Sequence, residues 1–418
     1  MSRFLFVVPP LTGHVNPTVG IARELAARGH DVAWTGTETV LRPLLGPRAQ
    51  VLGTGTRAFR AQGGHGLAAL RSLWEGFIVP YARFTAKPLD AAVRAYRPDA
   101  VLVDQHTPAG ALVAHRHRLP WASLAPGAME LGRPFRGLPQ VEAWMTGLLR
   151  GLWRRAGLPE EEYTDPRFSP ALVLAPTGPA LTGFAPAGPA PAGPAPSGPA
   201  PTGATPTGTA VLPAQVAQIG PVLVERPADP DFPWERLTPG RRRVLVTMGT
   251  LAGDLGQDFH TRAVRALALC GDDVQPVIAA PRDLLPELPD HAIAASRVPV
   301  LELLARGAVD AVLCHGGMNT VGEALAHGVP LVTAPIRHDQ PFVAAQVAAA
   351  GAGLRAPFPR ATPEQLAARL RAVLDEPRYR AAAARVGAEL LAGGGAVTAA
   401  DRLESLVAGE AGPRNPLV

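Results

Sequence analysis

The amino-acid sequence predicts an α/β protein made of two domains, each built on a parallel sheet. Its 418 residues are about twice the length of an ordinary domain, and 47% of them are hydrophobic, enough for two cores. Short apolar runs alternate with helical patterns in both halves, which is typical of strand–helix–strand units. A tract rich in Pro, Gly and Ala separates the two halves.

The amino-terminal half opens on a strand, a helix and a second strand. Residues 3–8 form a continuous apolar run, as expected of a central parallel strand. We expect a helix to start near Asn16 and Pro17, because Pro is favoured in a first turn, and to stop at residues 28–30. The next strand covers residues 31–35. The Gly-x-Gly-x-x-Gly pattern of dinucleotide-binding proteins is absent from this opening.

Two polar side chains follow strands of this half. His14 lies in the loop after the first strand, and Asp104 ends the buried-type strand 100–104. The carboxyl ends of neighbouring parallel strands meet, so the imidazole and the carboxylate could come together there. An Asp that accepts from one ring nitrogen stabilises the imidazolium formed at the other. The alternative is a loop histidine that only bonds backbone. His106 is a weaker candidate, which either lines the same site or caps a helix.

Residues 59–95 and 129–157 interrupt the strand–helix alternation with aromatic and Met residues. Apolar side chains in 141–153 recur at helical spacing, which predicts an amphipathic helix packed on its own domain rather than on a membrane. Residues 176–210 are consecutive pentapeptides with Gly in the third place of each. Having no charge and little to bury, this tract should be a disordered or polyproline-like linker. A docking motif is the less favoured alternative.

A turn in the carboxy-terminal half has the composition of a phosphate site. After strand 308–313, the chain passes through Cys314, His315, Gly316 and Gly317 into a helix. The free N–H groups and the dipole of a helix N-terminus favour an anion, although most strand–Gly–helix turns bind nothing. Further polar residues stand nearby in the sequence: Asn319, Thr320 and Glu323 on that helix, Asp339 and Gln340 after strand 328–335, and Thr250 after strand 243–248.

The run 297–340 resembles the donor-binding signature of the nucleotide-sugar-dependent glycosyltransferases that act on natural products. It contains H-G-G-x-N-T-x-x-E, then G-V-P and D-Q, with Pro299 sixteen residues before His315. His14 and Asp104 match the G-H-x-x-P motif and the strand-end Asp of that family. The resemblance implies a GT-B fold, in which two Rossmann-like domains face each other across a cleft. We expect an acceptor domain at 1–175, a linker at 176–210 and a donor domain at 211–412.

The resemblance also implies roles for individual residues. His14 and Asp104 would form the catalytic pair. Glu323 would bind the ribose hydroxyls, and Asp339 and Gln340 the hydroxyls of the transferred sugar. Arg297 stands where plant members of the family have a Trp, and Val300 where Gln is usual, which leaves the base, uridine or thymidine, open. The implied donor-binding set is Thr250, Val298, His315, Gly316, Gly317, Asn319, Thr320, Glu323, Asp339 and Gln340.

We therefore expect an inverting hexosyltransferase that uses a UDP- or dTDP-sugar and an apolar, hydroxyl-bearing acceptor, as in antibiotic biosynthesis. The alternatives are a nucleotide-sugar epimerase or hydrolase on the same fold, and a non-catalytic partner of a transferase. We expect no metal and no cofactor besides the nucleotide sugar.

The formal charge of +5 forms no basic stripe, so nucleic acid is not an expected partner. With two cysteines and no apolar run of about 18 residues, the chain should be cytoplasmic. Its oligomeric state is left open.

Overall fold

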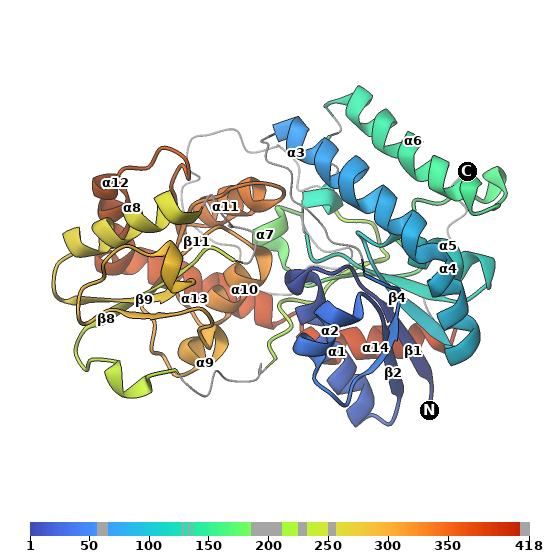
Figure 1. The fold of residues 1–418 in the computed structure, drawn as a ribbon, viewed down its shortest axis with the longest axis horizontal. Coiled ribbons are helices and arrows are strands. Elements are labelled where there is room, and N and C mark those ends of the chain that lie inside the picture. The colour runs from blue at the N-terminus through green and yellow to red at the C-terminus, as the bar shows by residue number, and fades with distance from the viewer. Residues whose placement is uncertain are drawn as a thin grey trace.

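The computed structural model describes residues 1–56, 66–127, 129–132, 134–135, 137–184, 211–224, 232–249 and 256–409. It has two α/β halves that lie side by side, each a parallel sheet covered by helices (Figure 1). This is the two-domain, parallel-sheet architecture predicted from the sequence. None of the helices within the described ranges has an apolar stretch of the length needed to cross a membrane.

The first sheet has the strand order β3-β2-β1-β4-β5-β6-β7. Its strands are β1 (Arg3–Val7), β2 (Asp31–Gly36), β3 (Gln50–Gly53), β4 (Ala100–Asp104), β5 (Trp121–Leu124), β6 (Val173–Ala175) and β7 (Val216–Gln218). All of the paired strands are parallel. The strand order reverses between β1 and β4, and ligands in such sheets bind outside the carboxyl ends of the strands at that point.

The helices of this half begin and end as follows: α1 (Thr12–Ala27), α2 (Glu38–Leu45), α3 (Gly66–Leu73), the π-helical turn η1 (Trp74–Ile78), α4 (Val79–Tyr96), α5 (Pro108–Arg116) and α6 (Pro139–Arg155). The short helix α7 (Pro179–Thr182) follows β6 and packs on the second half. The predicted amphipathic helix is confirmed as α6, whose Met145, Leu149, Leu152 and Trp153 are buried in the core of the first half. The start of α1 is corrected. The helix begins at Thr12, so His14 lies in its first turn and not in a preceding loop.

The second sheet has the strand order β10-β9-β8-β11-β12-β13, again all parallel. Its strands are β8 (Arg242–Thr247), β9 (Val274–Ala279), β10 (Ile293–Ala295), β11 (Ala311–Cys314), β12 (Leu331–Thr333) and β13 (Gly353–Arg355). Its helices are α8 (Gly256–Leu269), α9 (Val300–Ala305), α10 (Met318–Ala326), α11 (Gln340–Ala349), α12 (Pro363–Asp375) and α13 (Pro377–Leu391). The helix start predicted at residues 362–364 is confirmed, because Thr362 and Gln365 form a capping box.

The structure divides the chain differently from the expected boundaries. Strand β7 lies at 216–218, beyond the predicted linker, yet it pairs with β6 in the first sheet. Helix α14 (Gly395–Val407) also returns to the first half, where its apolar face joins the core beneath α1 (Figure 1). Arg28 of the first half contacts Asp401 at 2.6 Å and Glu404 at 2.7 Å. The carboxy-terminal segment therefore belongs to both halves.

The start of the predicted linker is also corrected. Residues 185–210 lie outside the described part of the chain, but residues 179–182 form the short helix α7. Leu181 of α7 is fully buried in the core of the second half, together with Val343 of α11 and Leu390 of α13. The second pentapeptide therefore contributes a core side chain, which a composition-based reading of the repeat does not anticipate.

We expect Leu181→Ala to lower the free energy of unfolding by about 2 kcal/mol, the low end for a buried leucine, because a four-residue helix can settle partly into the cavity. Chemical denaturation followed by circular dichroism measures the change. Leu391→Ala, which truncates a leucine that is 49% exposed at the end of α13, is the matched control and should cost much less. Equal costs for the two variants would contradict the assignment of Leu181 to the core.

Candidate active site

His14 and Asp104 meet at the carboxyl ends of β1 and β4. The His14 Nδ1 atom lies 2.8 Å from Asp104 Oδ2, and the Asp104 side chain is fully buried. The other carboxylate oxygen, Oδ1, accepts a hydrogen bond from the His106 backbone N–H at 2.8 Å. Because Asp104 binds Nδ1 of the ring, the Nε2 atom of His14 is the nitrogen left to accept a proton from a ligand.

A second histidine lies against the first. The rings of His14 and His106 are 4.6 Å apart between centroids and tilted by 34°. His106 Nε2 lies 3.7 Å from Glu130 Oε1, and Glu130 Oε2 accepts from Arg167 at 3.2 Å. Burial opposes a charge on His106, but Glu130 and Asp104 together raise its pKa above the ordinary value. The residue lines the cleft and does not cap a helix, because Thr107 is the N-cap of α5.

The predicted phosphate turn faces this pair from the second half. β11 ends at Cys314, and α10 begins at Met318 with Gly317 as its N-cap. The His315 ring packs between Gly249 and Gly317: a Cβ would lie 2.7 Å from the ring at Gly249 and 2.5 Å from Nε2 at Gly317. Burial lowers the pKa of His315 to about 4, with partial opposition from a hydrogen bond to the Thr247 backbone. His315 is therefore a neutral hydrogen-bonding group near pH 7, not a cation.

The loop between β12 and α11 supplies the other predicted residues. Gln340 is buried, and its Oε1 accepts from the backbone N–H groups of Ile336 and Arg337 at 2.9 and 3.0 Å. Asp339 precedes α11 and reaches toward Gly127 of the first half, where a Cβ would lie 3.5 Å from its Oδ2. Burial raises the pKa of Asp339, although the nearby His14 opposes this. Because the amide oxygen of Gln340 accepts both of those backbone hydrogen bonds, it holds the conformation of the loop between β12 and α11.

One cavity of about 730 Å³ joins these groups. Its wall on the first half is mainly apolar, and its polar residues gather where the two halves meet, with His14 and His106 on one side and His315, Asn319, Thr320, Glu323, Asp339 and Gln340 on the other. The apolar part of the wall comprises Leu11, Leu67, Leu70, Leu73, Met129 and Phe135. A space of this size and lining suits an apolar small molecule with few polar groups.

Three expectations from the sequence, on Thr250, on Val298 and on the absence of a metal, are not confirmed by the structure. Thr250 lies outside the described residues. Val298 packs against the core of the second half, while Val300 of α9 lines the cavity instead. Ligand atoms of His14, Asp104 and His106 lie within 4.8 Å of one another, a spacing that could admit a metal ion. The expectation that no metal takes part therefore stays a prediction.

Comparison with known proteins shows the same architecture along nearly the whole chain. The model of the erythromycin biosynthesis protein CIII-like C-terminal domain matches residues 269–406. The 4'-demethylrebeccamycin synthase of Lentzea aerocolonigenes is 29% identical over 97% of this chain and 100% of its own. Demethyllactenocin mycarosyltransferase of Streptomyces fradiae is 28% identical over 97% of this chain and 87% of its own.

Solved structures agree with the sequence relatives. The glycotransferase of kitacinnamycin has a TM-score of 0.74 and 24% identity, covering 97% of this chain and 99% of its own. Spinosyn rhamnosyltransferase SpnG complexed with thymidine diphosphate has a TM-score of 0.71 and 25% identity, covering 96% of this chain and 100% of its own. The chain is a glycosyltransferase with the GT-B fold, similar along nearly its whole length to enzymes of natural-product biosynthesis.

The glycosyltransferase carries site residues that sequence reasoning missed. Glu130 and Arg167 lie near His106 only in the folded chain, so no local motif marks them. His338 had a weak signal, because it directly precedes the Asp-Gln pair. It adopts a left-handed conformation with φ of 59°, which is unusual for a residue with a side chain. Burial, together with the charge of Arg337, lowers its pKa to about 4.

The lowered pKa values of His315 and His338 predict that the folded glycosyltransferase is less stable in acid. A buried histidine with a lowered pKa stabilises the fold above its unfolded pKa of about 6.5, and the contribution is lost as the pH falls from there toward 4. We expect the melting temperature to fall by several degrees between pH 7 and 5, and to fall less in His315→Gln, which has no proton to take up there. Parallel melting curves for the two proteins would contradict the buried, neutral state of His315.

Proposed function

We propose that this glycosyltransferase moves a hexose from a nucleotide diphosphate sugar to a hydroxyl of an apolar small-molecule acceptor, with inversion at the anomeric carbon. The observation that carries the proposal is the His14–Asp104 pair, 2.8 Å apart, with His14 lining the same cavity as the N-terminal residues of α10. One end is suited to accept a proton, and the other to hold a leaving diphosphate.

The reaction needs a base on the acceptor side. In the proposed mechanism His14 Nε2 takes the proton of the acceptor hydroxyl while the oxygen attacks the anomeric carbon from the face opposite the diphosphate. The bond from that carbon to the phosphate oxygen breaks, and its electron pair leaves with the diphosphate. Asp104, bonded to Nδ1, stabilises the imidazolium that forms.

The diphosphate would be held by dipoles and hydrogen bonds. The backbone N–H groups at the start of α10 carry the positive end of the helix dipole. His315 would donate a hydrogen bond from its neutral ring, since burial holds its pKa at about 4. Glu323, buried in the second turn of α10, and Asp339 both line the cavity. In this proposal Glu323 would accept from the ribose hydroxyls, and Asp339 from those of the sugar.

The acceptor class follows from the cavity wall and is consistent with the relatives. Leucines of α3, together with Met129 and Phe135, line the same cavity as His14. The names of two relatives, a 4'-demethylrebeccamycin synthase and a zeaxanthin glucosyltransferase, are consistent with a small-molecule acceptor. A secondary metabolite with a hydroxyl near one end suits the same surface.

The test is a matrix of UDP- and dTDP-hexoses against apolar hydroxylated acceptors, followed by mass spectrometry. We expect acceptor-dependent release of the nucleotide diphosphate and a glycoside whose anomeric configuration, read from proton coupling constants, is opposite to that of the donor. Release of free sugar at the same rate without an acceptor would favour a nucleotide-sugar hydrolase instead. Retention of configuration would exclude the single-displacement mechanism.

A further inference from the structure

The first turn of α1, which carries His14, contains a carbonyl that its own helix cannot use. In an α-helix the carbonyl of residue i accepts from the N–H of residue i+4. Residue i+4 for Gly13 is Pro17, which lies inside α1 and has no N–H. The Gly13 carbonyl, one residue before the proposed base, therefore lacks its regular helical donor.

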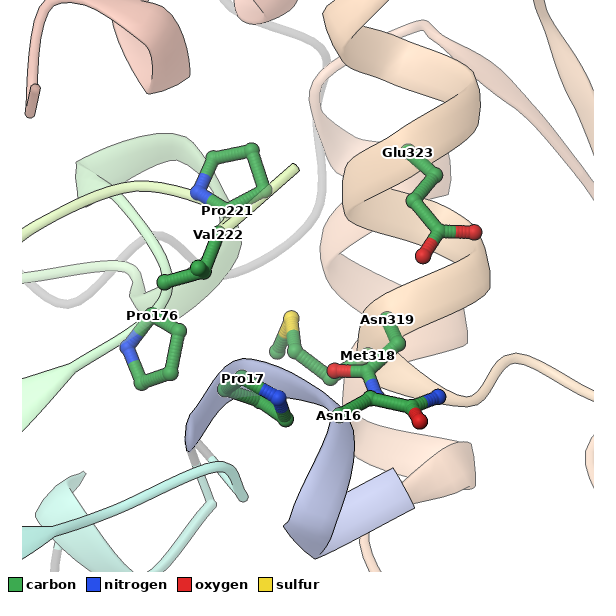
Figure 2. Close-up of a pocket in the computed structure, with 8 residues that line it drawn as sticks. All are labelled: Asn16, Pro17, Pro176, Pro221, Val222, Met318, Asn319 and Glu323. Carbon is green, nitrogen blue, oxygen red and sulfur yellow. The ribbon is translucent and has the colours of Figure 1, made fainter. Parts of the chain in front are cut away.

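The missing donor comes from the other half of the molecule. Asn319 Nδ2, in the first turn of α10, donates to the Gly13 carbonyl at 2.8 Å. Figure 2 shows the region where α1 and α10 meet, with Asn16 and Pro17 of α1 facing Met318 and Asn319 of α10, and Glu323 one turn further along α10. The space left between these residues is only about 10 Å³, too small to be more than a water-sized gap.

The first turn of α1 is weakly held by its own sequence. Its N-cap is Leu11, with no side-chain capping bond, and it contains Gly13, a residue with a high entropic cost in a helix. A hydrogen bond from a rigid neighbouring helix therefore restrains a turn that local interactions leave loose. His14 is adjacent to the bonded carbonyl, so the restraint acts directly on the position of its ring.

We propose that Asn319 is a positioning residue, which holds the first turn of α1 against α10 so that His14 faces the bound donor. This role rests on the proposed function of His14, and it differs from the phosphate contact implied by the family resemblance. The same bond connects the proposed donor site to the base across the two halves. A misplacement of about 1 Å at a reacting centre is enough to cost about 10²-fold in rate.

The first experiment separates positioning from phosphate binding. Asn319→Ala and Asn319→Ser are compared with the wild type for kcat at saturating substrates and for the Kd of UDP and dTDP measured by calorimetry. We expect kcat to fall about tenfold or more, with each Kd within about twofold of the wild-type value. A raised Kd with an unchanged kcat would make Asn319 a phosphate ligand only and overturn the proposal.

Pro17 provides the matched control. Pro17→Ala restores an N–H at residue 17, within the same helix, that can reach the Gly13 carbonyl. On this background Asn319→Ala should lower kcat by only about threefold, because the carbonyl then has a second donor. The same loss of kcat on both backgrounds would show that Asn319 acts without Gly13.

A readout without turnover separates this proposal from the proposed function. Amide hydrogen exchange at residues 14–16 and 18, near the start of α1, should be faster in Asn319→Ala than in the wild type, while His14→Ala should leave the Asn319–Gly13 bond and the exchange rates in place. Should His14→Ala keep full turnover while Asn319→Ala exchanges faster, the base assignment fails and the contact stands. Unchanged exchange rates in Asn319→Ala would mean that the Asn319–Gly13 hydrogen bond does not restrain the first turn of α1.

Discussion

Replacing His14 with Ala should lower kcat by about 10²–10⁴-fold, the contribution typical of a general base. The affinity for UDP or dTDP should stay within about twofold, because His14 belongs to the first half and the proposed diphosphate site is at α10 in the second. Steady-state kinetics with saturating donor measure the first quantity, and calorimetry with the nucleotide alone measures the second.

Two further variants make this result specific. Asp104→Asn keeps the shape of the side chain but removes the charge that stabilises the imidazolium, so kcat should again fall by orders of magnitude. His30→Ala removes an imidazole that bonds Glu404 at 2.8 Å, away from the cavity, and should leave kcat unchanged. Turnover by His14→Ala at the wild-type rate would leave the proposed mechanism without a base.

Gly317→Ala should weaken the binding of UDP or dTDP by up to about 10²-fold. The added Cβ would lie 2.5 Å from Nε2 of His315, so the ring must move away from the N-terminus of α10. The backbone itself tolerates alanine, because Gly317 has an extended conformation with φ of −66° and ψ of 135°. The predicted loss comes from the hydrogen bond between His315 and the phosphate, which is worth about 1.5–3 kcal/mol for a charged partner.

A double mutant tests whether the methyl acts through the ring. On a His315→Ala background, Gly317→Ala should change the Kd by little, since no imidazole remains to be displaced. Equal losses on both backgrounds would instead mean that the methyl blocks the phosphate directly. Gly147→Ala, on the exposed face of α6 with no atom within 4 Å of its added Cβ, is the control and should leave binding unchanged.

Much of the fold follows from patterns that are local in the chain. The apolar runs that became β1, β4 and β8 were visible as strands, because buried parallel strands are apolar on both faces. The pairing of His14 with Asp104 followed from the rule that polar residues at the carboxyl ends of adjacent strands converge. The helix beginning at Thr362 was marked by its own capping residues. Each of these features depends on neighbours within a few residues, or on a general property of parallel sheets.

Other features depend on partners that are distant in the chain. The start of α1 at Thr12 was missed, because residues 12–15 have no capping signal and the turn is held partly by Asn319, 306 residues away. The burial of Leu181 depends on α11 and α13, and the return of α14 depends on a face of the first half that only folding creates. Likewise, Glu130 contacts His106, and Arg167 contacts Glu130, in a part of the fold that no periodicity reveals.

The sequence by itself determined the two parallel sheets, the strand–Gly–helix turn at residues 315–317 and the histidine–carboxylate pair, since short-range patterns and strand-end geometry specify them. Only the tertiary structure decided that β7 and α14 pack in the first half, that burial keeps His315 neutral, and that Asn319 donates to the Gly13 carbonyl next to the proposed base. Burial and long-range hydrogen bonding belong to the packed chain, because they depend on which surfaces meet and not on the order of the residues that form them.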